Sequence, residues 1–291
     1  MAISPNLSDK DNASLIESTE TAGQAARAVV NPDGTDVVPG VVITSPLTDY
    51  DLEVALGNVT GTTSFGKWGR NPNIHSISSE DVWDGGGDYP YILSATTLTM
   101  SSSDANDVNT TGTGAWQVMI YGLNSSYVDI TETVNLNGTT GVTTSNSFFR
   151  VNRMAVITAG SGGFNIGDLS LKNGVDTVGK ILSGFNKTQM AIYTVPAAKT
   201  LVIMKMNLSA VPHLSSIGIK EGVFNLLIRV ENGVFQLQRA WGFTSRNGSS
   251  SIVTLEPGLK VVAKSDVKLR FNAHNRHTEP MGDINGYLVE D

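Results

Sequence analysis

Four histidines and two acidic loops hold most of the side chains of this 291-residue chain that could act as bases or metal ligands. The chain has no cysteine, so thiol nucleophiles, zinc–thiolate sites, iron–sulfur clusters and disulfides are excluded. His75 and His213 stand alone, whereas His274 and His277 are three residues apart. Residues at that spacing on a strand face opposite sides, so a chelating pair would need a turn. An exposed structural pair is therefore favoured over a metal site.

Carboxylates gather in two glycine- and asparagine-rich stretches. The first stretch holds Glu80, Asp81, Asp84 and Asp88, and the second holds Asp104 and Asp107. Oxygen ligands on such loops could hold calcium, but the spacing is not that of an EF-hand. A glycosidase would need two carboxylates at a fixed separation, which a sequence does not show. We interpret these residues as solvated turn residues that cap backbone N–H groups.

Two catalytic motifs are approached but not completed. The segment GTTSFGK at residues 61–67 fits the start of a P-loop, yet Trp68 stands where a hydroxyl must reach magnesium. No Gly-x-Ser-x-Gly elbow occurs, because Ala159 precedes Ser161 by two residues. The sequence therefore predicts a protein that is not an enzyme, with no catalytic residues, no cofactor and no bound metal.

Tryptophans offer a different kind of contact. Trp116 lies in an apolar strand and is expected in the core, whereas Trp68 and Trp83 lie beside glycines in loops. Such rings are typical of subunit interfaces, and a sugar-stacking platform is the alternative. The possible interface or ligand residues are Trp68, Arg70, Trp83, Asp84 and Trp241.

The elements that would position these residues are short strands. Charged residues make up only 16% of the chain and glycines number 30, a composition that disfavours a helical bundle. Phe224, Leu226 and Ile228 alternate with other residues and lead into Asn232-Gly233, a strong hairpin signal. The net charge of −7, without any basic run, argues against nucleic-acid binding. No apolar run reaches the roughly 18 residues of a membrane span, so no membrane contact is expected.

The strand pattern predicts an all-β protein with two β-sandwich or jelly-roll-like domains in series after an extended N-terminal arm. Residues 1–56 form the anchoring arm, residues 57–186 the β-sandwich domain and residues 187–291 the jelly-roll-like domain. Within the arm, Asn12 or Ser14 could cap a short helix that reaches Val29. The arm has too few apolar residues for a core of its own, so it is either flexible or ordered only against neighbours.

Several segments, spread over roughly residues 57–290, resemble a family of tailed-bacteriophage virion structural proteins from marine and freshwater phages. The matching segments are FGKWGRNP at 65–72, EDVWDGGG at 80–87, GTGA at 112–115, GL at 122–123, ETV at 132–134, YTVP at 193–196 and KSDV at 264–267. The chain departs from the family at Ala197-Ala198-Lys199, where a glycine is expected. The resemblance implies a component of the virus particle and carries no catalytic residues.

Together these observations predict a non-enzymatic structural protein on the exterior of a tailed-phage particle, assembled in the bacterial cytoplasm. It would decorate and cement the head, or be mounted on the tail or fibre base. Its expected partners are its own copies, as a homotrimer, and the major capsid protein or tail and neck proteins. The alternative is an adhesin that binds host-surface glycan, and a third class is a hydrolase that uses the acidic loops.

Overall fold

The computed structural model describes residues 15–17, 27–29, 49–214, 216–245 and 250–291 and divides the chain into two compact units, Met1–Asn58 and Val59–Asp291. In the first unit, β1 (Leu15–Glu17) pairs antiparallel with β2 (Arg27–Val29). A helix ending at Val29 was therefore the wrong prediction for these residues; the rest of that helix and most of the predicted arm lie outside the described residues. The helix α1 (Tyr50–Ala55) begins where the Asp49 side chain accepts a hydrogen bond from the Asp51 N–H.

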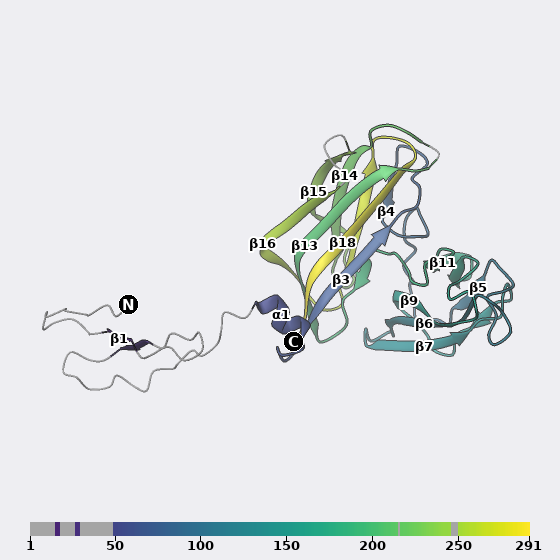
Figure 1. Ribbon diagram of the computed structural model, residues 1–291, viewed down its shortest axis with the longest axis horizontal. Helices are drawn as coiled ribbons and strands as arrows, with labels where there is room; N and C mark the ends of the chain where they lie inside the picture. The colour runs from purple at the N-terminus through teal and green to yellow at the C-terminus, as the bar shows by residue number, and fades with distance from the viewer. Residues whose placement is uncertain (1–14, 18–26, 30–48, 215, 246–249) are drawn as a thin grey trace, which may run out of the picture. The chain divides into compact units, whose positions relative to one another are not determined.

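Two antiparallel sheets of the second unit share the larger core, and we call them together the C-module (Figure 1). One sheet has the order β16 (Ser251–Val261), β13 (Lys199–Pro212), β18 (Thr278–Glu290) and β3 (Thr62–Arg70). The other has the order β12 (Ile192–Thr194), β17 (Asp266–Ala273), β14 (Glu221–Arg229) and β15 (Gln236–Thr244), with β4 (Ser79–Asp81) also paired to β17. Both sheets send alternate side chains into the space between them, which makes the core.

The predicted hairpin is confirmed. β14 pairs antiparallel with β15, and Phe224, Leu226 and Ile228 are buried in the C-module core. Asn232 takes a positive φ of 59°, and the Gly233 N–H donates to the Val230 carbonyl oxygen to close the turn. An asparagine tolerates this left-handed backbone better than most residues, which is why the Asn-Gly pair predicted a turn at this position.

Two further antiparallel sheets share a second core, and we call them together the N-module. One sheet has the order β7 (Asp129–Asn135), β6 (Ala115–Leu123) and β9 (Arg150–Ala159). The other has the order β11 (Asp176–Ile181), β10 (Leu169–Asn173), β5 (Thr99–Ser102) and β8 (Val142–Thr143). The second core includes Met100, Ile120, Phe148, Met154 and Leu171, none of which is exposed.

The all-β prediction is confirmed, whereas strand pairing does not follow the predicted linear division at residue 187. β3 pairs with β18 and β4 pairs with β17, so residues 62–81 belong to the C-module and not to a contiguous domain 57–186. Pairings between distant strands carry no local sequence signal, because they are made by backbone N–H and C=O groups, which nearly every residue carries. The assignment of the C-terminal half as a jelly roll stays a prediction.

Candidate functional site

The carboxylate of Asp266 connects the two modules. Its Oδ1 lies 2.9 Å from Nε of Arg150 on β9, and its Oδ2 lies 2.9 Å from Nε of Arg229 on β14. The Thr194 hydroxyl donates to Oδ1 at 2.5 Å. The Arg150 guanidinium also stacks over the Phe149 ring, 4.0 Å from its centroid. A buried carboxylate is thus satisfied by two cations and a hydroxyl, which is the arrangement that offsets its desolvation.

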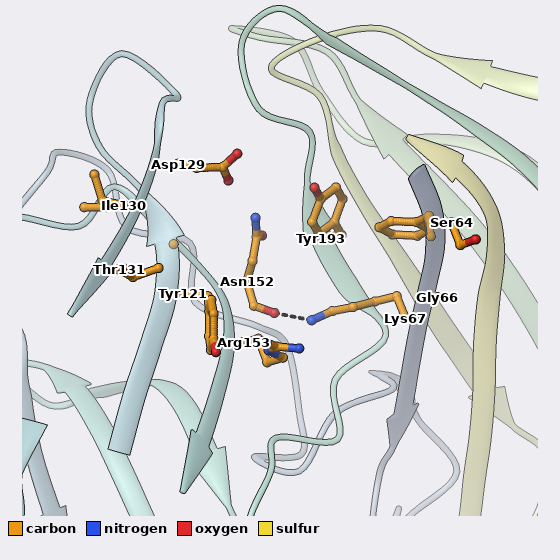
Figure 2. A pocket seen from close by; sticks show the side chains of 12 residues that line it. Ser64, Gly66, Lys67, Tyr121, Asp129, Ile130, Thr131, Asn152, Arg153 and Tyr193 are labelled. Carbon is orange, nitrogen blue, oxygen red and sulfur yellow. Dashed lines mark hydrogen bonds between the residues drawn. The ribbon is translucent and has the colours of Figure 1, made fainter. Parts of the chain in front are cut away.

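Beside this ion pair, Asn152 joins β9 to β12. Its Nδ2 donates to the Thr194 carbonyl oxygen at 3.1 Å, and its Oδ1 accepts from the Thr194 N–H at 2.9 Å. The buried ammonium of Lys67, which comes from β3, donates to the Asn152 carbonyl oxygen (Figure 2). Residues from β3, β9 and β12 therefore meet at one junction between the modules.

Two cavities lie at this junction and share Gly66, Lys67 and Arg153 in their walls. The first cavity has a volume of about 320 Å³, and the second a volume of about 280 Å³. Figure 2 shows the first cavity, with Lys67 and Tyr193 on one side and the strands that carry Tyr121, Asp129 and Arg153 on the other. The further wall residues of the second cavity are Trp68, Phe185, Lys187, Thr188 and Gln189.

Cations dominate the wall that the cavities share. Lys67 is buried, and burial, followed by the nearby charges of Arg153 and Lys187, lowers the pKa of its ammonium to about 7. The Arg153 guanidinium stacks 3.9 Å from the centroid of the Tyr121 ring. Within the described ranges, no carboxylate forms an ion pair with any of these three cations. The junction can therefore accept a negative charge from a ligand.

The structure brings four of the five predicted site residues to residues 189–190. The N–H groups of Arg70 and Asp84 both donate to the Gln189 carbonyl oxygen, Trp83 forms a bridge with Met190, and Trp68 lines the second cavity with Gln189. Trp68 is 44% exposed, and Arg70 pairs with Glu279 at 2.6 Å, with Phe185 beside its guanidinium. Trp83 was expected in a loop as a possible interface or ligand residue, but it is buried against Tyr89 and Met190, so its ring serves as core. The flanking glycines allow this, because a Cβ at Gly85 would meet the Trp83 ring at 2.1 Å.

Asp84 belongs to this group, whereas Trp241 lies elsewhere. Asp84 is buried, and its Oδ2 accepts from the Gln189 N–H at 2.8 Å while its Oδ1 has no hydrogen-bond partner. Desolvation raises the pKa of this carboxyl to about 7. Trp241, on β15, lines another cavity of about 450 Å³ beside β16 and packs against the C-module core.

The acidic loops cap backbone N–H groups, as predicted, but several of their carboxylates are buried and not solvated. Asp107 is fully buried and accepts from the N–H groups of Ala115, Ile166 and Gly167 and from the Ser102 hydroxyl. Asp81 is also fully buried, pairs with Lys268 at 2.8 Å, and has its pKa raised by desolvation. Buried hydrogen-bonded carboxylates of this kind hold loops in place.

Neither the histidines nor the P-loop-like segment assemble a reactive site in the described part of the chain. His75 lies edge-on to His277, with ring centroids 5.5 Å apart. Over the described ranges, no three histidine, aspartate or glutamate side chains group so that they could hold a metal ion. Residues 62–67 are part of β3, a strand paired to β18, so their N–H groups do not form the loop that cradles phosphate.

Sequence reasoning did not single out Lys67, Arg153 and Lys187. The signal for Lys67 was its position: it shares a strand face with Phe65 and lies opposite Ile284 of β18, where an apolar residue is the norm. Arg153 and Lys187 carried no such signal, because their approach to Lys67 depends on how the two modules pack. In the described part of the chain, no helix has the length and apolar character required to cross a bilayer.

Comparisons with known proteins find viral capsid proteins at low structural similarity. No protein-family model and no curated protein sequence matches the chain. The STIV MCP crystal structure aligns with a TM-score of 0.23 and 8% identity, over 78% of this chain and 97% of that chain. The infectious bursal disease virus Gt strain structure aligns with a TM-score of 0.19 and 11% identity, over 83% of this chain and 78% of that chain. The crystal structure of the infectious bursal disease virus VP2 subviral particle aligns with a TM-score of 0.20 and 11% identity, over 80% of this chain and 73% of that chain. These scores do not establish a shared fold.

Proposed function

We propose that the chain is a non-enzymatic structural protein of a virus particle and that its described β modules dock on other particle proteins. The observation that carries this proposal lies between β13 and β14 of the C-module, at the described residues 213–214 and 216–220, which we call the tip loop. Leu214 is 100% exposed and Ile217 is 97% exposed, and Ile219 beside them is 40% exposed. Three large aliphatic side chains in solvent within one short loop are typical of a surface that another protein covers.

The sequence resemblance to tailed-phage virion proteins supports the same function, since its segments fall in both modules. The buried network around Asp266 supports it as well, because it ties the modules into one compact unit that could bear load. In this proposal the unit Met1–Asn58 mounts the protein, and copies associate as a trimer on the head exterior or at the tail or fibre base. Major capsid, tail or neck proteins are the proposed partners, and the virion is the proposed location.

Quantitative mass spectrometry of purified particles of the virus that encodes the chain tests this function. We expect the protein to remain with the particles through a density gradient. A copy number close to that of the major capsid protein would place it on the head, and a far lower one on the tail. Absence of the protein from purified particles would overturn the proposal.

Substitution of the tip loop tests the docking surface. Leu214→Ser combined with Ile217→Ser is expected to reduce incorporation into particles about tenfold or more. Val175→Ser is the matched control, because Val175 is 94% exposed but lies in the β10–β11 turn of the N-module. Equal incorporation of both variants would show that the tip loop is not the docking surface.

A further inference from the structure

The two cavities at the module junction have the size and wall chemistry of a small-molecule site, and this feature is separate from the tip loop. Their volumes of about 320 and 280 Å³ are each close to the lower end of the ligand-pocket range. Because they share Gly66, Lys67 and Arg153, one elongated ligand could contact both. The wall is drawn from β3, β6, β7, β9 and β12 and from residues 185–189, so most of it stands on strands.

Charge defines what the shared wall would bind. Lys67 and Arg153 belong to this shared wall, and Lys187, from a third segment, lines the second cavity, in a chain whose net charge is −7. Asp129, at the edge of the first cavity, forms its ion pair with Lys199 at 3.2 Å. A buried ammonium with only a carbonyl partner is costly, and a bound anion would offset that cost.

Two further features prepare the site for a directional ligand. The Arg153 guanidinium is held by stacking on Tyr121, so its N–H fork loses little freedom when it binds a planar carboxylate. Gln189 is 4% exposed, and its Oε1 lacks any hydrogen-bond partner. Gln189 is part of the wall of the second cavity, and a buried acceptor of this kind calls for a donor.

We propose that the junction cavities bind an acidic saccharide, whose carboxylate meets Lys67, Arg153 and Lys187 and whose hydroxyl groups meet the polar remainder of the wall. Tyr121, Tyr193 and Thr131 line the first cavity, and each carries a hydroxyl group that can donate and accept a hydrogen bond. Inorganic phosphate or sulfate would satisfy the cations but would leave most of either cavity empty. An acidic peptide would bring a carboxylate but not a ring of hydroxyls.

Isothermal titration calorimetry on the full chain, with matched acidic and neutral sugars, tests the proposal. The probes are a galacturonate trisaccharide with its methyl ester, and sialyllactose with lactose. We expect saturable binding of at least one acidic sugar and at least tenfold weaker binding of its neutral counterpart, because charge-assisted hydrogen bonds are lost. Inorganic phosphate and a poly-glutamate peptide serve as competitors, and each is expected to compete at least tenfold more weakly.

Three variants locate the binding. Arg153→Gln and Lys187→Gln are each expected to weaken binding about tenfold or more, and the urea midpoint of each reports whether it folds. Lys172→Gln removes one charge from an exposed position on β10 and should leave binding unchanged. Lys187→Gln keeps the test informative if Arg153→Gln fails to fold.

The outcomes are distinct from those of the virion experiment, because binding in solution does not depend on a particle. Failure of both acidic sugars to bind at about 10 mM would overturn the proposal, since that concentration is well above weak ligand affinities. Equal binding of the neutral sugars, equal competition by phosphate or the peptide, or unchanged binding by folded Arg153→Gln and Lys187→Gln would each overturn it as well.

Discussion

Arg150 and Asp266 form an ion pair between the N-module and the C-module, with Nε 2.9 Å from Oδ1 and both side chains at most 7% exposed. The Arg150 Nη1 also donates to the Ile92 carbonyl oxygen at 2.8 Å, so the guanidinium is satisfied from several sides. The pair belongs to the same junction as the two cavities, because the carbonyl oxygen of Asn152, two residues after Arg150, accepts a hydrogen bond from the Lys67 ammonium. The ion pair and the wall of the first cavity therefore share one strand, β9.

Asp266→Asn should destabilise the protein, since the substitution leaves Arg150 as a buried cation without its counter-charge. We expect the free energy of unfolding to fall by about 3–5 kcal/mol. Glu231→Gln is the control, because Glu231 pairs with Lys264 at the surface and should change stability by less than about 1 kcal/mol. Urea unfolding of the two variants measures the difference, and similar small losses for both would contradict the assigned role of Asp266.

Burial of Asp84 makes stability depend on pH. Its pKa of about 7 in the folded protein exceeds the value near 4 in an unfolded chain, so between these values the folded state binds the extra proton. Stability should therefore fall as pH rises from about 4 to about 7, and this loss is complete above that window. Asp84→Asn removes the effect, so wild type should lose on the order of 2 kcal/mol more than the variant between about pH 5 and about pH 8. Parallel curves from urea unfolding would disprove it.

The titration of Lys67 should change stability in the opposite direction and over a higher pH range. Its pKa is about 7 when folded and 10.5 when unfolded, so the unfolded chain binds more protons between these values. Wild-type stability should therefore rise with pH above 7, by an amount on the order of 2 kcal/mol up to about pH 9.5. Lys67→Met should remove this rise and be more stable than wild type at neutral pH. A Lys67→Met curve that still rises like wild type would contradict it.

The same titration predicts how saccharide binding depends on pH. A bound carboxylate favours charged Lys67, so affinity should increase as pH falls from about 8 to about 6. The other charged or titratable groups that face the cavities are Arg153, Lys187, Tyr121, Tyr193 and Asp129. Calorimetry at the two pH values measures this change in affinity. An affinity that does not depend on pH would show that the Lys67 ammonium does not interact with the bound carboxylate.

The turn at Ala198 offers a stabilising substitution. Ala198 has a φ of 58°, a left-handed conformation that costs an alanine about 1 kcal/mol relative to glycine. Ala198→Gly should therefore raise the free energy of unfolding by about 0.5–1 kcal/mol. Ala240→Gly, at an exposed position within β15, should lower it by a similar amount. A loss of stability in Ala198→Gly would show that the turn does not need this conformation.

Local patterns predicted much of the strand content and little of the site. Asn232-Gly233 and the alternation at Phe224 and Leu226 identify a hairpin, because turn chemistry and strand periodicity both act over a few residues. The position of Trp83 could not be predicted in this way. Glycine neighbours are compatible with an exposed loop and also with a ring that packs over backbone without side chains, and only the tertiary contact with Met190 shows that the ring is buried. The junction cavities were not predictable, since their walls come from segments far apart in the sequence.

The pairing of β3 with β18 has a consequence for how the chain is made. Thr63 on β3 donates to the Leu288 carbonyl oxygen, 225 residues later, so the first strand of the C-module leaves the ribosome long before its partner exists. The N-module is complete in the meantime and can fold during synthesis. In the newborn chain β3 therefore stays unpaired until β18 has been synthesised, and a product truncated before β18 would expose the unpaired edge of β3.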